Sequence, residues 1–260
     1  MNDYIFTKNS EDAEKARLQM IEAACDPATI SLLEQSGVQP GWRCLELGPG
    51  AGSIMRWLGA RVGATGRVIG IDKNSSYLGD LTGSPYSLIE GDITETELPL
   101  TFDLIHGRYV LIHTKDTDSI LKKLRKALAP GGLIVLEEPD FTSAHRLNPT
   151  SNASVQKVNA AICRMFSNFG LDPGYALTLP ARLEAQGFAI DSVNSNLHFA
   201  PGGTPIARLM GESARVLHQE YTATGEADES DIEEYARFAA DKTQWAVYYL
   251  TVSVIGSSGA

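Results

Sequence analysis

The sequence contains little cysteine. Only three such residues occur among 260, and they stand far apart, at Cys25, Cys44 and Cys163. None has a partner at the CxxC spacing that is typical of zinc sites and thiol redox motifs. An odd number of widely spaced cysteines does not suit a disulfide framework either. We therefore expect no metal site and no disulfide-linked fold, and a cytoplasmic location fits best.

Positive charge is also scarce. The chain has 22 basic and 32 acidic residues, which gives a formal net charge of −10, so its surface repels a phosphate backbone on average. The first residues lack the basic and apolar segments of a signal peptide. The longest uncharged stretch follows Lys242 and contains polar residues throughout, unlike a membrane span. We expect no nucleic-acid partner and no membrane, and a homo-oligomer stays open.

Short apolar runs alternate with helical patterns between about Arg43 and Glu138. The helical patterns, such as Ser53–Val62 and Asp116–Leu128, repeat apolar side chains every three or four residues. Such alternation is typical of βαβ units with a parallel sheet. The expected strands are Arg43–Leu47, Arg67–Ile71, Tyr86–Glu90, Phe102–Ile105 and Leu133–Leu136.

The flanking segments have a different character. Glu11–Ala24 and Thr29–Gln35 have the pattern of two helices before the first strand. We expect three regions: an N-terminal helical arm (1–40), an α/β core (41–140), and a helical cap that also supplies the last two strands (141–260). The elements expected in the cap region are helices over Ser151–Phe169, Pro180–Gln186, Pro205–Glu220 and Glu229–Asp241, and strands over Phe188–Phe199 and Trp245–Ile255.

A glycine-rich turn follows the first expected strand. Gly48, Gly50 and Gly52 stand immediately before the first helix of the core, where small residues let a ligand approach the backbone amides. Asp72 ends the second expected strand, 22 residues after Gly50. A carboxylate at that place can accept hydrogen bonds from both hydroxyls of a ribose. The turn and the acid together predict an adenosine-type ligand at the carboxyl edge of the sheet.

Four segments carry a family resemblance. The pattern from Glu46 to Gly52 resembles the ExGxGxG motif of class I S-adenosylmethionine-dependent methyltransferases. Three later segments are similar to that family in the same order, namely Glu90–Ile93, Phe102–His106 and Leu128–Glu137. The resemblance implies S-adenosylmethionine as cofactor. It also implies a Rossmann-like, doubly wound α/β fold with sheet order 3-2-1-4-5-7-6 and an antiparallel strand 7.

The resemblance further implies residue roles at the two ends of the cofactor. Glu46 orders the glycine turn or contacts the cofactor's ammonium group, which the backbone near His106 and Arg108 also faces. The residues that line the methionine end are Gly48, Gly50 and Gly52.

At the nucleoside end, Asp72 holds the ribose hydroxyls and Lys73 lies beside the adenine. Asp92 hydrogen-bonds the adenine amino group, and Ile93 packs nearby. In many small-molecule methyltransferases an N-terminal arm folds over the cofactor, so residues of the arm are further candidates for contact, among them Tyr4, Arg17 and Gln19.

His106 is the candidate catalytic residue. It ends the fourth expected strand, toward the place where cofactor and substrate meet. An unperturbed histidine titrates near pH 6.5 and is mostly neutral at pH 7, so it can act as a general base toward a hydroxyl acceptor. The carboxylates that follow strand five are further candidates for substrate contact, namely Glu137, Glu138 and Asp140.

We expect methyl transfer to a small molecule, for example a secondary metabolite. His106–Tyr109 stands where many amino-methylating nucleic-acid enzymes have an Asn-Pro-Pro-Tyr-like tetrapeptide. Two alternatives stay open. The first is a protein of the same fold that binds S-adenosylmethionine without transferring its methyl group, as a cyclase, lyase or sensor. The second is an NAD-dependent oxidoreductase, because dinucleotides also use a glycine turn followed by an acid.

Overall fold

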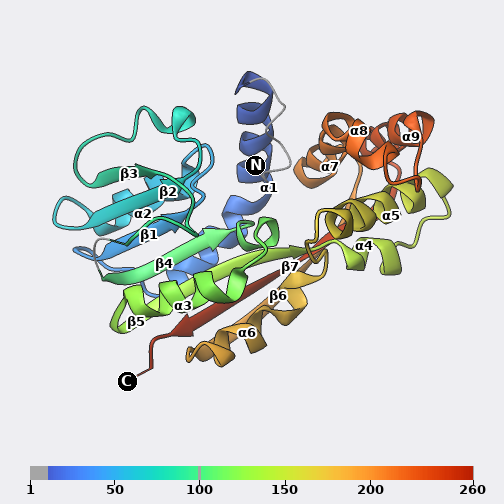
Figure 1. Cartoon of the computed structure of the whole chain (residues 1–260). Helices are drawn as coiled ribbons and strands as arrows, with labels where there is room; N and C mark the ends of the chain where they lie inside the picture. Colours follow the sequence, from blue (N-terminus) through green and yellow to red (C-terminus); the bar gives the residue numbers. More distant parts are fainter. Residues whose placement is uncertain (1–10, 99–100, 260) are drawn as a thin grey trace. The chain divides into compact units, whose positions relative to one another are not determined.

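The computed structural model describes residues 11–98 and 101–259. Within these residues, seven strands form one sheet in the order β3-β2-β1-β4-β5-β7-β6, and β7 runs antiparallel to the others (Figure 1). This confirms the predicted fold class and strand order. The strands are β1 (Arg43–Leu47), β2 (Arg67–Asp72), β3 (Tyr86–Glu90), β4 (Phe102–Arg108), β5 (Leu128–Asp140), β6 (Ala189–Pro201) and β7 (Trp245–Ser257).

β1 lies at the centre of the parallel part of the sheet. Leu45 is in register with Ile69 of β2 and Ile105 of β4, and all three side chains are buried. Runs of this kind are expected for parallel strands, because helices cover both faces. One register step onward, Glu46 pairs with His106. The sheet therefore brings two ionisable side chains together inside an apolar core.

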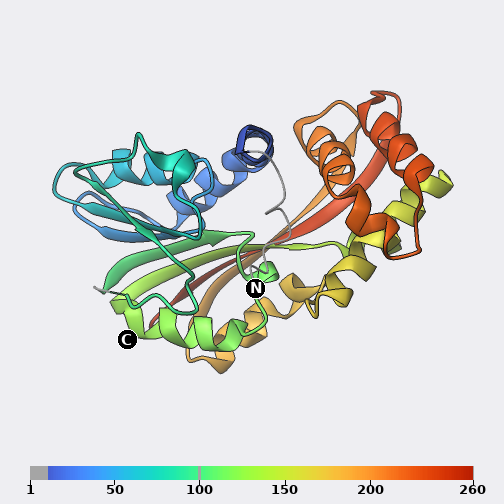
Figure 2. The same ribbon diagram turned by 45° about the horizontal axis from the view of Figure 1, so that its top comes forward.

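Helices cover both faces of the sheet. Figures 1 and 2 show α2 on one face and α3 and α6 on the other. α3 begins at an N-cap, because the Asp116 side chain accepts a hydrogen bond from the backbone N–H of Ser119. The helices are α1 (Glu11–Gln35), α2 (Ser53–Val62), α3 (Thr117–Ala127), α4 (Thr142–Leu147), α5 (Ala153–Asn168), α6 (Leu179–Ala185), α7 (Pro205–Val216), α8 (His218–Thr222) and α9 (Glu229–Ala240), with short 3-10 turns η1 (Ser76–Leu78), η2 (Leu111–His113) and η3 (Tyr175–Thr178).

The described residues divide into two compact units. The sheet unit consists of Cys25–Glu138, Thr178–Asn194 and residues 253–259. The helical unit consists of residues 11–24, Pro139–Leu177 and Ser195–Val252. The predicted division at residues 40 and 140 stays a prediction.

Inside the helical unit, α9 packs against α5 and α7. Its N-terminus has a capping box, in which the Asp228 side chain accepts from the Asp231 backbone and the Asp231 side chain accepts from the Asp228 backbone. Asp231 also accepts hydrogen bonds from Lys157 at 3.0 Å and from the Ser154 hydroxyl at 2.8 Å. One carboxylate thus fixes the start of α9 and joins it to α5.

Three expectations about local structure are wrong. The two helices predicted before β1 are one helix, α1, which continues through Pro27. The fifth strand, expected over Leu133–Leu136, is the longer β5, which begins at Leu128 and contains an irregularity where its pairing with β4 shifts register. The helix expected over Pro205–Glu220 is interrupted at Leu217, which separates α7 from α8.

Gly202 follows β6 at a close approach of two backbone segments. A Cβ at this position would lie 2.3 Å from the backbone oxygen of Asp241, so we expect Gly202→Ala to lower the free energy of unfolding by about 1–3 kcal/mol. Gly79 is the control, because no heavy atom of the described residues lies within 4 Å of its would-be Cβ. Urea unfolding of both variants tests this; equal midpoints would contradict it.

Candidate functional site

The glycine turn joins β1 to α2 in a left-handed backbone conformation. Gly48, Gly50 and Gly52 have φ angles of 57°, 58° and 92°, a region that other residues rarely adopt. Space is restricted as well, because a Cβ at Gly48 would lie 2.7 Å from Cγ2 of Val110. The turn leaves the N-terminus of α2 without a side-chain cap at Gly52.

Asp72 lies beside this turn. Its Oδ2 accepts a hydrogen bond from the backbone N–H of Gly50 at 3.4 Å, and its Oδ1 accepts one from Asn74 at 3.0 Å. Burial raises the pKa of Asp72, while the backbone hydrogen bonds from Asn74 and Gly50 act in the opposite direction. The structure thus brings together the turn and the acid that stand 22 residues apart in sequence.

Lys73 and Asp92 form an ion pair beside Asp72. The Lys73 ammonium lies 2.9 Å from Asp92 Oδ2, and Asp92 Oδ1 accepts from the backbone of Thr94 at 2.8 Å. Partial burial acts to raise the pKa of Asp92, but the hydrogen bonds from Lys73 and Thr94 outweigh it and lower that pKa. Ile93 is buried next to them. The four residues predicted for the nucleoside end therefore lie at the end of β2 or shortly after β2 and β3.

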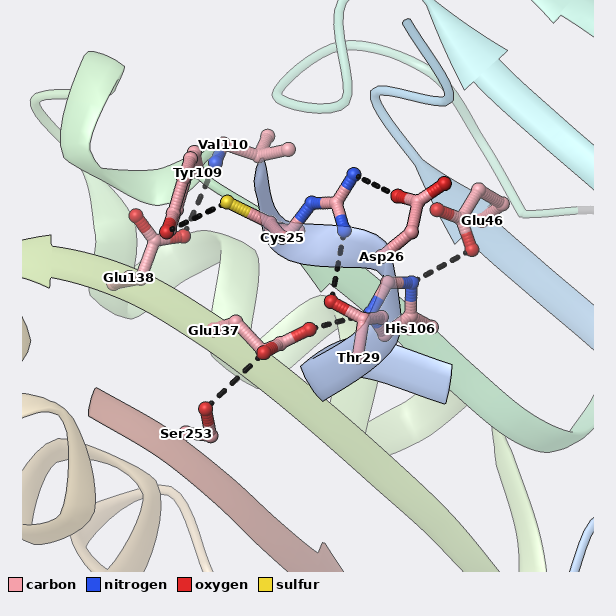
Figure 3. Close-up of polar contacts among 11 residues, drawn as sticks. Cys25, Asp26, Thr29, Glu46, His106, Tyr109, Val110, Glu137, Glu138 and Ser253 are labelled. Atoms are coloured by element: carbon pink, nitrogen blue, oxygen red, sulfur yellow. Dashed lines mark hydrogen bonds and ion pairs between the residues drawn. The ribbon is translucent and has the colours of Figure 1, made fainter. Parts of the chain in front are cut away.

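A buried histidine lies between two glutamates (Figure 3). His106 Nδ1 is 2.8 Å from Glu46 Oε2 of β1, and His106 Nε2 is 3.4 Å from Glu137 Oε1 of β5. Burial alone would lower the pKa of His106, but the two carboxylates outweigh it and raise the pKa to about 9. The surroundings of His106 therefore differ from those of the unperturbed histidine that the sequence led us to expect. Its predicted role as a base stays a prediction.

Arg108 is held by α1. Its guanidinium donates to the Asp26 carboxylate at 2.9 Å and to the Thr29 hydroxyl at 2.8 Å. Sequence reasoning misses the pairing of Asp26 and Thr29 with β4, because it predicts a break in the helix between Ala24 and Thr29. Asp26 and Thr29 stand one turn apart if the helix is continuous, and this spacing is the sequence signal that would have indicated their common role.

Glu138 holds the backbone that follows β4. Its carboxyl oxygens accept from the N–H groups of Val110, Leu111 and Ile112 at 3.1, 2.8 and 3.0 Å. Complete burial raises the pKa of Glu138 to about 8, although the three amides act to lower it. Tyr109, the residue before Val110, has a positive φ of 60°. Glu138 therefore fixes a strained turn rather than lying at a free loop.

The remaining candidates have other surroundings. Asp140 belongs to the helical unit, where Thr142 and Ser143 donate to its carboxylate. Arg17 is buried and pairs with Glu14 at 2.7 Å, and Gln19 is exposed. Tyr4 lies outside the described residues.

Among residues 11–98 and 101–259, no group of three or more His, Cys, Asp or Glu side chains could hold a metal ion. In the same part of the chain, no helix has the length and apolar character needed to cross a membrane.

Comparison with known proteins decides the family. The profile of a methyltransferase domain matches residues 12–192, which is more than half of the chain. The chain belongs to this methyltransferase-domain family. Membership confirms the resemblance drawn from the motifs, and with it S-adenosylmethionine as the cofactor.

Individual relatives are more distant. The chain is 36% identical over 115 residues to the ubiquinone/menaquinone biosynthesis C-methyltransferase UbiE of Laribacter hongkongensis, covering 40% of this chain and 46% of that protein. It thus spans about half the length of the curated relatives it matches.

Solved structures share the fold at low identity. Phosphoethanolamine N-methyltransferase 2 of Haemonchus contortus, solved with S-adenosyl-L-methionine, matches with a TM-score of 0.63 at 15% identity, covering 99% of this chain and 60% of that one. The [4+2]-cyclase SpnF matches with a TM-score of 0.58 at 17% identity, covering 90% and 81%.

The residues at the turn fit this cofactor. Glycine adopts the positive φ angles of this turn and has no side chain that could block the approach to the N-terminal amides of α2. The nucleoside end offers the carboxylates of Asp72 and Asp92, which can accept hydrogen bonds from hydroxyl and amino groups.

The charge of His106 can be measured directly. We expect its imidazole to stay protonated at pH 7–8 and to titrate near pH 9 in NMR spectra of protein labelled with ¹⁵N-histidine, assigned with His106→Gln. Because the folded pKa lies above the ordinary 6.5, the proton stabilises the fold fully below pH 6.5, and this stabilisation is lost as pH rises through about 9. The difference in the free energy of unfolding between wild type and His106→Gln should therefore shrink as the pH rises through about 9. A midpoint near 6.5 would contradict the raised pKa.

Proposed function

We propose that this protein transfers a methyl group from S-adenosylmethionine to a small-molecule acceptor. The observation that carries the proposal is the contact between the glycine turn and Asp72, at 3.4 Å from the Gly50 amide, in a chain of the methyltransferase-domain family. An acid at the end of β2 beside such a turn is the arrangement that binds the ribose of a nucleoside.

Each cofactor-binding residue has a proposed task. Asp72 would accept hydrogen bonds from the ribose hydroxyls, and Asp92 from the adenine amino group, with Lys73 and Ile93 beside the adenine. The methionine end would lie along Gly48, Gly50 and Gly52, near Glu46 and the backbone of His106 and Arg108. The bound cofactor supplies a methyl group on a sulfonium, which is already an activated leaving group. The protein's own contribution is binding and alignment.

A small-molecule acceptor is favoured by charge and by the relatives. The net charge of −10 opposes nucleic acid. The named relatives act in ubiquinone and menaquinone biosynthesis and on phosphoethanolamine. Cys25, Cys44 and Cys163 are not joined in disulfides, which suits the reducing cytoplasm.

A second function has specific support. SpnF shares the fold and its name describes a [4+2]-cyclase, so a protein of this architecture that binds S-adenosylmethionine without transferring its methyl group is the alternative.

Asp72→Ala tests cofactor binding. We expect the affinity for S-adenosylmethionine to fall roughly ten- to a hundredfold, since hydrogen bonds to a charged group contribute about 1.5–3 kcal/mol. The matched control is Asp118→Ala, which removes an exposed carboxylate of the same unit that pairs with Arg182. Calorimetry measures both affinities, with circular dichroism to verify the fold. Unchanged affinity in a folded Asp72→Ala protein would remove the ribose role.

Mass spectrometry separates the two functions. Incubation with a metabolite extract and cofactor that carries a trideuterated methyl group should yield a product heavier by the labelled methyl group. A product that forms only with cofactor yet gains no label would identify the non-transferring alternative. Heat-denatured protein is the control for uncatalysed transfer.

A further inference from the structure

His106 occupies a charged position inside the sheet. The three strands that supply Glu46, His106 and Glu137 are neighbours in the sheet, and the His106 side chain is completely buried. Both ring nitrogens face a carboxylate oxygen, at 2.8 and 3.4 Å. Ser253 of β7 donates to the other oxygen of Glu137 at 3.1 Å. Both ring nitrogens are therefore donors in the protonated form, and neither has a free lone pair.

The charged groups around His106 do not balance. It faces the carboxylates of Glu46 and Glu137, and on the same strand the Arg108 guanidinium pairs with Asp26. Three carboxylates meet two cations, which leaves one negative charge. Cys25 and Tyr109 contact each other nearby, and burial raises the pKa of Glu138 to about 8. A buried surplus of one negative charge is costly unless a cation compensates it.

Glu46 is the carboxylate that can receive such a cation. Its Oε2 is bonded to His106, while no hydrogen bond from the described residues reaches its Oε1. In Figure 3 the dashed line to His106 runs from one oxygen of Glu46, and no dashed line reaches the other. Glu46 stands two residues before Gly48, where the glycine turn begins and along which the methionine end of the proposed cofactor would lie.

We propose that His106 is a positioning residue, whose imidazolium fixes one oxygen of Glu46 so that the other oxygen receives the ammonium group of S-adenosylmethionine. The inference rests on the proposed cofactor site. It gives His106 a task that its burial permits, whereas a proton acceptor would need a free ring nitrogen. A neutral side chain in its place removes the charged hydrogen-bond partner of Glu46 Oε2, so the carboxylate is no longer held in the orientation that receives the ammonium group.

A double-mutant cycle tests this with S-adenosylhomocysteine as probe, measured by calorimetry at pH 7.5. We expect His106→Gln to lower its affinity about tenfold in the wild-type background and less than twofold in a Glu46→Gln background, because residues that act through one another are not additive. For an analogue of S-adenosylhomocysteine that lacks the amino group, we expect His106→Gln to lower the affinity less than twofold in either background. His218→Gln, which removes an exposed histidine paired with Glu229 at 2.9 Å, is the matched control.

A second measurement needs no substitution and covers the case in which His106→Gln does not fold. In wild-type protein labelled with ¹⁵N-histidine, saturation with S-adenosylhomocysteine should move the titration of His106 to lower pH, because an ammonium on Glu46 disfavours a second cation beside it. The analogue without the amino group should leave the titration in place.

The outcomes distinguish this inference from the proposed function. Additive effects of His106→Gln and Glu46→Gln, or a His106 titration that the probe does not move, would overturn the positioning role while leaving the cofactor site intact. Failure of wild-type protein to bind S-adenosylhomocysteine would overturn both.

Discussion

The central constraint in this molecule is the burial of Glu46, His106 and Glu137 across three adjacent strands. Parallel strands bury both faces under helices, so ionisable side chains there must satisfy one another. The register that places His106 opposite Glu46 therefore affects the alignment of whole strands as well as these two side chains. It requires that β1, β4 and β5 keep their alignment, and the carboxyl ends of these strands carry the glycine turn and the segment that Glu138 holds.

Much of the fold is predictable from the sequence, because the strands of the sheet unit are short apolar runs with turn residues between them. β1 and β3 begin and end where the pattern predicts. The failures have physical causes. Pro27 is a local signal to end a helix, yet α1 continues through it. The irregularity in β5 depends on its pairing with β4, and this pairing cannot be predicted from either segment of the sequence alone.

The candidate site is also predictable from the sequence only in part. Spacing predicts the meeting of Gly50 and Asp72, since a βαβ unit with a fixed crossover brings them to one edge. It does not predict the surroundings of His106. Glu137 is 31 residues away, and Ser253 lies 116 residues beyond Glu137. Only tertiary contacts could show that this histidine is buried between two carboxylates.

The hydrogen bonds of Glu138 have a consequence for protein engineering. The backbone path from Val110 to Ile112 depends on a carboxyl group 26–28 residues later in the chain. A graft of the segment after β4 into another methyltransferase scaffold would therefore carry its sequence without its conformation. The graft keeps its shape only where the recipient has a buried glutamate at the matching position of its own fifth strand, so donor loop and recipient strand have to be exchanged as one piece.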